Sequence, residues 1–169
     1  ELIAKAVNHT TKPTVWDGTG GLGRDSFVLA SLGLNVQTFE QHPAVACLLV
    51  DGLERALQEP EIQDIARRIT FRHGDAVELM QELATQSRPD IVYLDPMYPE
   101  RQKSAAVKKE MAYFHSVVGA ARAIAKKRVV VKRPRLGEFL NGEKPAYQYT
   151  GKSTRFDVYL PDHPVKDGE

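Results

Sequence analysis

Four glycines crowd a stretch of six residues near the start of the chain, directly after a short apolar run. The stretch reads VWDGTGGLGRD over residues 15–25, and Gly18, Gly20 and Gly23 fit the spacing G-x-G-x-x-G. Glycine permits tight turns and a close approach of the backbone to a ligand. This spacing between a strand and a helix is typical of nucleotide-like ligands bound at the edge of an open parallel sheet. It therefore predicts an α/β fold.

The rest of the sequence alternates strand-like apolar runs with helical patterns, as such a fold requires. Strands are predicted at 14–17, 35–40, 69–72, 90–95 and 128–131, helices at 24–32, 43–58 and 76–84, and a closing hairpin at 147–150 and 155–160. A long helix is predicted from the apolar stripe formed by Val107, Met111, Phe114, Val118, Ala121 and Ala125. We expect one Rossmann-like domain over residues 1–169, with a mostly parallel sheet, helices on both faces and an antiparallel C-terminal strand.

An aspartate stands directly before the glycines, and it bears on which ligand the loop holds. Arg24 and Asp25 follow Gly23, where an ATPase phosphate loop would carry Lys and then Ser or Thr. A dinucleotide would place its pyrophosphate at the helix N-terminus, where Asp17 repels it without excluding it. S-adenosylmethionine instead carries an ammonium, which Asp17 could pair with directly or through water. Glu40, at the end of the second strand, could accept ribose hydroxyls from either ligand.

The stretch LDPMYP at 94–99 ends the fourth predicted strand. Its plainest interpretation is a proline-rich turn. However, it also resembles the D-P-P-Y-like motif of amino-methyltransferases, which act on exocyclic nitrogens of bases. The Asp95 carboxylate and the Pro96 carbonyl could orient such an amino group, and Tyr98 could stack on the base. Together with the glycine loop, the motif indicates methyl transfer from S-adenosylmethionine, helped mainly by alignment.

Longer stretches are similar to one particular family. WDGTGGLGRDSF (16–27), DPMYPERQKSAAVKKEM (95–111), RVVVKRP (128–134) and GKSTRFDVY (151–159) resemble RsmJ, a bacterial family of small-subunit (16S) ribosomal RNA methyltransferases. That family methylates the exocyclic N2 of one guanine near the 3′ end of the RNA. The resemblance covers nearly the whole chain and implies a class I methyltransferase fold. Family members carry an additional N-terminal segment, so we expect the natural protein to extend upstream of Glu1.

The cofactor residues follow partly from the loop and partly from this resemblance. The loop itself predicts Asp17, Gly18 and Gly20 beside the cofactor. The resemblance implies further S-adenosylmethionine contacts at Arg24, Asp25, Glu40, Gln41, Asp75, Ala76 and Asp95. Asp75 could instead simply cap the helix that follows it.

Basic residues gather in the second half of the chain. Residues 101–135 hold eleven Lys or Arg and one acid, a formal charge of +10 against −9 for the remainder. A basic block beside an acidic body suggests an anionic partner, and nucleic acid is the commonest one. The alternative is a solvated helix face and loop. In the first case, phosphates around the target guanine would be held by Arg101, Lys103, Lys108, Lys109, Lys132, Arg133 and Arg135.

Several sequence features limit the function. No apolar run approaches the roughly 20 residues of a membrane span, and the five histidines lack metal-ligand spacing. Cys47 is the only cysteine, which suits a reducing cytoplasm, and its apolar neighbours predict that it is buried. We therefore expect a cytoplasmic protein without a metal. Rival hypotheses are methyl transfer to adenine N6 or a protein amide, an NAD-dependent oxidoreductase, and an RNA-binding module without catalysis.

Overall fold

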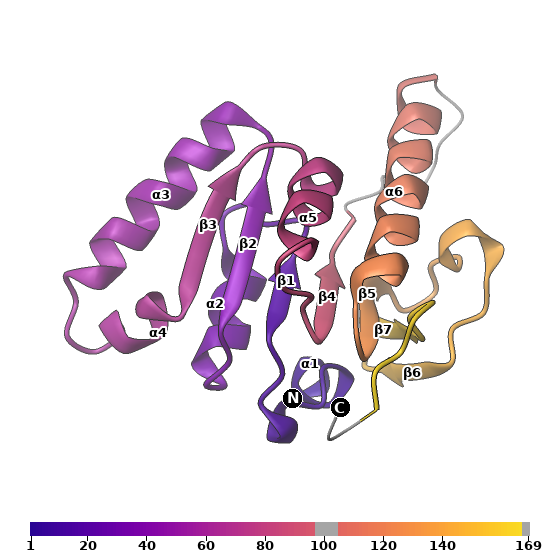
Figure 1. Ribbon diagram of the computed structural model, residues 1–169, viewed down its shortest axis with the longest axis horizontal. Helices are drawn as coiled ribbons and strands as arrows, with labels where there is room; N and C mark the ends of the chain where they lie inside the picture. Colours follow the sequence, from indigo (N-terminus) through magenta and orange to yellow (C-terminus); the bar gives the residue numbers. More distant parts are fainter. Residues whose placement is uncertain (97–104, 167–169) are drawn as a thin grey trace.

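The computed structural model describes residues 1–96 and 105–166, whose strands form one seven-stranded sheet of order β3-β2-β1-β4-β5-β7-β6 (Figure 1). The strands are β1 (Val15–Asp17), β2 (Val36–Glu40), β3 (Ile69–His73), β4 (Ile91–Leu94), β5 (Arg128–Pro134), β6 (Tyr147–Thr150) and β7 (Thr154–Tyr159). β1 to β5 are parallel, and β7 is antiparallel to both of its neighbours. The strand order reverses between β1 and β4. Ligands of open α/β sheets bind at the carboxyl ends of the strands beside such a reversal.

Helices cover both faces of the sheet, which gives the structure two apolar cores. The helices are α1 (Leu2–Ala6), α2 (Arg24–Ser31), α3 (Pro43–Leu57), α4 (Gln63–Arg67), α5 (Ala76–Ala84) and α6 (Ala105–Ile124). Side chains alternate across β4, so Ile91 and Tyr93 enter the core under α1 and α2. Val92 and Leu94 enter the core under α5 and α6. Figure 1 shows α5 and α6 in front of the sheet and α2 behind it. The predicted Rossmann-like architecture is confirmed.

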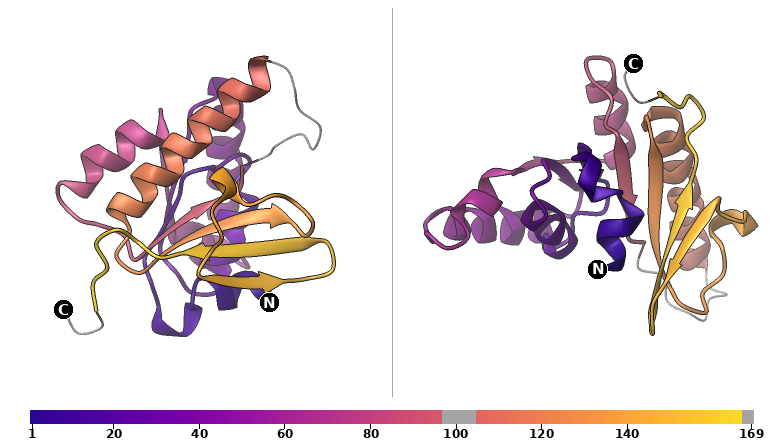
Figure 2. Two further views of the ribbon diagram at one scale, coloured as in Figure 1. Left: turned by 90° about the vertical axis from the view of Figure 1, so that its right-hand side faces the viewer. Right: turned by 90° about the horizontal axis from the view of Figure 1, so that it is seen from below.

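The C-terminal hairpin lengthens β5 beyond its predicted end. β7 pairs with β5 as far as Pro134, with Lys132 opposite Phe156 and Arg133 opposite Arg155. The left view of Figure 2 shows β5, β7 and β6 side by side at this edge. The predicted strand at 128–131 therefore ends too early, because β5 continues through Lys132 and Arg133. Because they are consecutive strand residues, their side chains point to opposite faces of the sheet.

Two further features differ from prediction. The short helix α4 was not predicted, because its five residues, QDIAR, are too few to show a helical period. Cys47 is exposed, so the prediction that it is buried is wrong. The buried residues of α3 are Ala46 and Leu49. Cys47 follows Ala46 by one position, which turns it about 100° away from that inward face.

The glycine loop packs tightly against β2. The Gly20 N–H donates to the Phe39 carbonyl at 2.9 Å. A Cβ at Gly20 would lie 2.5 Å from the Thr38 Oγ1 and 2.8 Å from the Phe39 carbonyl oxygen. Backbone atoms cannot move aside as a flexible side chain can. Close backbone approach therefore requires glycine here.

Gly20→Ala should destabilise the fold by about 1–3 kcal/mol, because the added methyl overpacks the loop against β2. Gly119→Ala is the matched control, since a Cβ at this helical glycine meets nothing within 4 Å. The control should be neutral or more stable than the wild type, because alanine is the better helix former. Urea unfolding of the three proteins measures the difference. Equal stability of the two variants would contradict the close packing.

Candidate active site at the carboxyl edge of the sheet

The fold gathers the predicted site residues at the carboxyl ends of β1, β2 and β4 and at the start of α5. Asp17 ends β1, Arg24 and Asp25 begin α2, and Asp95 and Pro96 follow β4. Glu40 and Gln41 lie at the end of β2, Asp75 and Ala76 at the start of α5, and Gly18 and Gly20 in the loop after β1. Tyr98, Arg101 and Lys103 lie outside the described residues.

Asp17 lies beneath the glycine loop, with only 1% of its surface exposed. Its Oδ1 accepts from the Thr19 N–H at 3.0 Å, and its Oδ2 accepts from the Ser26 hydroxyl at 2.6 Å. Burial raises the pKa of Asp17 to about 6, although these hydrogen bonds oppose the shift. Asp17 thus ties β1, the loop and α2 together. Its pairing with a ligand ammonium stays a prediction.

Thr19 links the glycine loop to the residue that follows β4. Its Oγ1 accepts from the Asp95 backbone N–H at 2.8 Å and donates to Asp17 Oδ1 at 3.2 Å. One hydroxyl therefore joins the buried carboxylate to the LDPMYP motif. Thr19 was not predicted as a site residue. Its local bond to Asp17 is the common turn in which an aspartate accepts from the N–H two residues on, but no local pattern indicates its bond to Asp95.

Glu40, at the end of β2, binds the backbone of the same glycine loop. Its Oε1 accepts from the Gly21 N–H at 2.9 Å, and its Oε2 accepts from the His42 N–H at 2.8 Å. Each carboxylate oxygen has a second lone pair. The predicted ribose contact is therefore compatible with these bonds and stays a prediction. The neighbouring Gln41 is exposed, and its carbonyl lies 3.1 Å from the His73 Nε2.

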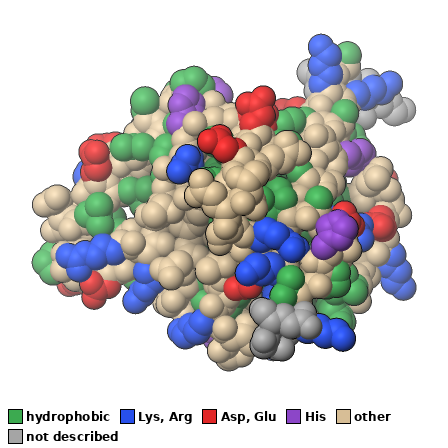
Figure 3. Space-filling model, viewed as in Figure 1, with side chains coloured by type: hydrophobic (Ala, Val, Ile, Leu, Met, Phe, Trp, Pro, Cys, Tyr) green, Lys and Arg blue, Asp and Glu red, His purple; other side chains and the backbone are tan. Residues whose placement is uncertain are grey.

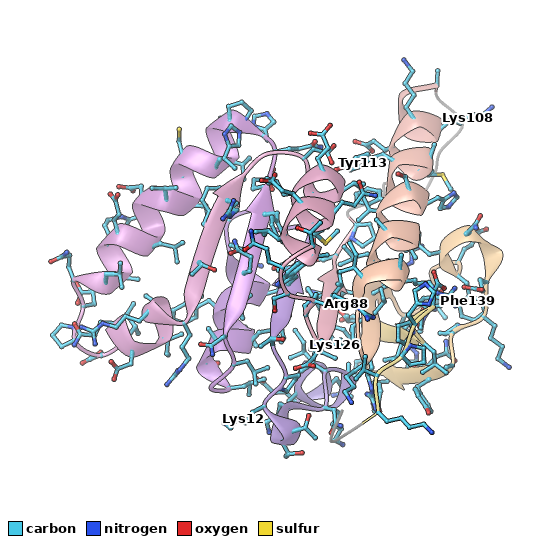
Figure 4. The ribbon with its side chains drawn as sticks, in the orientation of Figure 1. Lys12, Arg88, Lys108, Tyr113, Lys126 and Phe139 are labelled. Atoms are coloured by element: carbon cyan, nitrogen blue, oxygen red, sulfur yellow. The ribbon has the colours of Figure 1, made fainter. Side chains whose placement is uncertain are left out.

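Asp75 caps α5, because its carboxylate accepts from the Glu78 N–H at 3.1 Å. Tyr113 reaches this helix start from α6 (Figure 4). Burial raises the pKa of Tyr113, and the adjacent Asp75 carboxylate raises it further. The cap that was one of two alternatives for Asp75 is thus present. An aromatic side chain that the sequence analysis missed stands beside Asp75 and Ala76, where a cofactor contact was expected.

A charged cluster occupies the space between α2, β4 and β5. Asp25 Oδ2 accepts from the Tyr93 hydroxyl at 2.7 Å and from the Lys132 Nζ at 3.4 Å. Lys132 Nζ also lies 3.7 Å from Asp95 Oδ2. Burial raises the pKa of Asp95, the Lys132 ammonium opposes this shift, and the Asp25 carboxylate adds to it. Burial and the Asp25 carboxylate together raise the pKa of the Tyr93 hydroxyl well above its ordinary value.

The charge at this edge suits a cationic ligand with hydroxyl groups. Five carboxylates lie here, and the Lys132 ammonium is held between two of them. A pyrophosphate would meet this negative charge unfavourably, whereas an ammonium or sulfonium would be stabilised by it. The residues present thus fit S-adenosylmethionine better than a dinucleotide. The edge carboxylates are Asp17, Asp25, Glu40, Asp75 and Asp95.

Arg24 borders an apolar hollow at the start of α2. Its side chain is exposed and helps line a hollow of about 380 Å³ between α2 and α3. The other lining residues are apolar, among them Leu22, Phe27 and Leu53. The hollow contains none of the edge carboxylates. Its chemistry therefore differs from that expected of the cofactor site.

The predicted RNA contacts differ in whether their side chains are exposed or have partners within the protein. Lys132 points into the acidic cluster. Arg133 is 7% exposed, and its guanidinium donates to the Glu138 carbonyl at 2.9 Å. Both cations thus have partners inside the protein, and a direct phosphate contact by either one stays a prediction. Lys108, Lys109 and Arg135 are exposed.

Among residues 1–96 and 105–166, no group of three or more His, Cys, Asp or Glu is placed to hold a metal ion. Within the same ranges, no helix is both long enough and apolar enough to cross a membrane.

Comparisons with known proteins agree with this geometry. Residues 1–161 match the model of a family described as putative SAM-dependent methyltransferase. The chain is 72% identical to ribosomal RNA small subunit methyltransferase J of Neisseria gonorrhoeae, over 95% of this chain and 69% of that protein. A protein of the same name from Thioalkalivibrio sulfidiphilus is 49% identical, over 95% of this chain and 68% of that protein.

Solved structures agree as well. The crystal structure of a SAM-dependent methyltransferase from Neisseria gonorrhoeae superposes with a TM-score of 0.84 at 62% identity, covering 100% of this chain and 74% of that chain. An RNA methyltransferase from Salinibacter ruber, in complex with S-adenosyl-L-homocysteine, gives a TM-score of 0.64 at 13% identity. The match covers 99% of this chain and 93% of that chain. The second likeness concerns the fold alone.

The fold and the site define a Rossmann-like class I methyltransferase, an enzyme whose cofactor is S-adenosylmethionine. More specifically, the chain belongs to the RsmJ family. The resemblance in the sequence and the expected cofactor are therefore confirmed. Of the two ligands that the glycine loop left open, the family selects S-adenosylmethionine over NAD.

Asp17→Asn tests the buried carboxylate through the pH dependence of stability. A raised pKa means that the folded state binds the proton more tightly than the unfolded chain. The stability from Asp17 is then fully present below about pH 4 and is lost as the pH rises through about 6. Relative to the variant, the wild type should lose about 2 kcal/mol between pH 4 and pH 7, since one pKa unit corresponds to about 1.4 kcal/mol and the unfolded carboxyl is already partly ionised at pH 4. Urea unfolding at each pH measures this, and a constant difference would contradict it.

Proposed function

We propose that this chain transfers a methyl group from S-adenosylmethionine to the exocyclic N2 of a guanine near the 3′ end of small-subunit (16S) ribosomal RNA. Support for the RNA comes from the names of relatives up to 72% identical to this chain. The observation that carries the chemistry is the position of Asp95 and Pro96 at the carboxyl end of β4, joined by Thr19 to the glycine loop.

The acceptor chemistry follows from the nature of an aromatic amino group. Its lone pair is delocalised into the base, so the nitrogen is a poor nucleophile. The Asp95 carboxylate and the Pro96 carbonyl accept hydrogen bonds from this amino group, which orients it and increases its electron density. Tyr98 stacks on the base in this proposal. S-adenosylmethionine, when bound, supplies an activated methyl group on its sulfonium.

Asp95 and Pro96 contribute mainly alignment. Methyl transfer forms a bond from the amino nitrogen to the methyl carbon as the bond from that carbon to sulfur breaks. The attacking nitrogen must therefore lie in line with the bond that breaks, and holding it there accounts for much of the rate. No strong base is required, because the proton leaves the nitrogen after the methyl group has arrived.

The RNA is held by basic side chains at the same end of the sheet. Figure 1 shows that α6 begins on the side of the sheet to which β1 to β4 point, and that its first turn projects beyond these strands. Lys108 projects from that end of the helix (Figure 4), and Lys109 is exposed beside it. The space-filling view in Figure 3 shows Lys and Arg side chains at this end of the molecule. Arg135 follows β5 and is exposed. These cations, with Arg101 and Lys103, grip phosphates and so position the RNA without reading its sequence.

The proposed substrate indicates the cellular compartment in which the protein works. Ribosomal RNA in bacteria lies in the cytoplasm, so we propose that the protein works there, on naked RNA or on an assembled small subunit. Neither form of substrate requires a metal ion for the chemistry described above.

The proposal is tested by methyl transfer from labelled S-adenosylmethionine to small ribosomal subunits lacking the modification, with naked RNA in parallel. The wild type should yield labelled N2-methylguanosine after digestion of the RNA. Asp95→Ala should lower transfer by about a hundredfold or more, since it removes the carboxylate that orients the amino group. Asp51→Ala is the matched control, because Asp51 is an exposed acid on α3 paired only at the surface with Arg55.

Other products would redirect the assignment. Labelled N6-methyladenosine or a labelled protein amide would replace guanine N2 by one of the rival acceptors. Cofactor binding without any transfer to the RNA would overturn the ribosomal substrate. Full function in Asp95→Ala would instead favour an RNA-binding module without catalysis.

A further inference from the structure

Among the predicted RNA contacts that the structure describes, Lys132 is the basic residue turned toward Asp95. It lies on β5, which pairs with β4 in parallel with Leu94 opposite Val131. Continuing this register by one residue places Lys132 opposite Asp95. Val130 and Tyr93 share a core, so Lys132 and Asp95, two residues further along each strand, lie on that same face.

Among the described residues, the ion pairs of Lys132 are with two acids of the site. Its Nζ lies 3.4 Å from Asp25 Oδ2 and 3.7 Å from Asp95 Oδ2. The side chain is 29% exposed, and those of Asp25 and Asp95 are 17% and 31% exposed. Water screens partly buried charges less than it screens exposed ones. Each of these three charges therefore acts strongly on the other two.

Two carboxylates and one ammonium therefore share a small space. Without the cation, Asp25 would repel the negative charge of Asp95 and favour a protonated carboxyl there. A protonated carboxyl cannot accept a hydrogen bond at both oxygens, and its hydroxyl would meet the N–H of an incoming amino group donor to donor. The ammonium removes this conflict and fixes the position of the Asp95 carboxylate between β4 and β5.

We propose that Lys132 is a positioning residue for Asp95, which it holds ionised and oriented toward the acceptor amino group, instead of an RNA phosphate contact. This inference rests on the proposed methyl transfer to a base amino group. Lys132 does not touch the reacting atoms in this account. It acts through Asp95, while Tyr93 orients the neighbouring Asp25 through the 2.7 Å hydrogen bond.

The charged and titratable groups around Asp95 are few among the described residues. Asp25 faces it from α2, and Lys132 faces it from β5. The Tyr93 hydroxyl, from β4 itself, interacts with Asp95 as well, and the buried Asp17, from β1, acts on Tyr93. Of the two charged groups that face Asp95, Asp25 raises its pKa and Lys132 lowers it. The removal of Lys132 should therefore move the ionisation of Asp95 toward higher pH.

The test compares Lys132→Met with Lys132→Arg and Lys132→Gln in the full-length protein. For Lys132→Met, kcat at saturating RNA should fall by about tenfold or more at pH 7, and the acidic limb of the kcat profile should move up by about one pH unit. Lys132→Arg should restore much of kcat and much of the wild-type pH profile, because arginine keeps the positive charge. Lys132→Gln provides a polar variant in case the methionine variant does not fold, and thermal melting checks each protein. Arg135→Ala, which removes an exposed cation, should raise KM for RNA without moving the pH profile.

A second readout does not depend on the RNA. The carbon-13 signal of the Asp95 carboxyl, assigned with Asp95→Asn, should titrate at higher pH in Lys132→Met or Lys132→Gln than in the wild type. An unchanged titration, or a rise in the KM for RNA with kcat and its pH profile intact, would overturn the role of Lys132. Failure of the wild type itself to methylate the RNA would overturn the proposed function, which separates the two outcomes.

Discussion

The hydrogen bonds of one buried carboxylate organise the reactive edge of this protein. Asp17 is enclosed, and the hydroxyl of Ser26 and both donors of Thr19 satisfy its oxygens. An ionised group in such a place is stable only when donors surround it. These donors belong to the glycine loop and to α2. Their bonds to Asp17 therefore hold the loop and the first turn of α2 in place against the end of β1. Through Thr19 the same network reaches the Asp95 backbone, on the strand beyond the reversal of the sheet.

Negative and positive charges occupy different places around this edge of the sheet. Within the site, the carboxylates suit the ammonium and hydroxyls of S-adenosylmethionine, and Lys132 reduces the repulsion between Asp25 and Asp95. Outside, exposed cations at the start of α6 and after β5 suit a polyanion. A phosphate chain is attracted to the rim by long-range forces and is repelled from the acidic interior. The near-zero net charge of the chain conceals this division, which only the placement of the residues reveals.

Local patterns in the sequence were sufficient for the architecture. Apolar periodicity located the strands and long helices, and the loop glycines indicated where the chain must approach itself closely. The patterns could not show how residues distant in sequence meet. Pairing with β7 carries β5 through Lys132, so that this lysine meets Asp25 rather than solvent. Thr19 was overlooked for a similar reason, because its partner Asp95 lies 76 residues away. Likewise, Cys47 shares an apolar segment with buried neighbours but faces outward.

The hydroxyl of Thr19 holds the glycine loop in register with the LDPMYP motif. The decisive measurement is kcat for methyl transfer in Thr19→Val, with Thr19→Ser as the control that keeps the hydroxyl. The valine variant loses both part-buried hydrogen bonds of the hydroxyl, and a loss of about 1.4 kcal/mol in the transition state corresponds to about tenfold in rate. We expect kcat to fall by about this factor in the valine variant at saturating cofactor, whereas the serine variant stays near the wild type. A folded valine variant with wild-type kcat would contradict this role of Thr19.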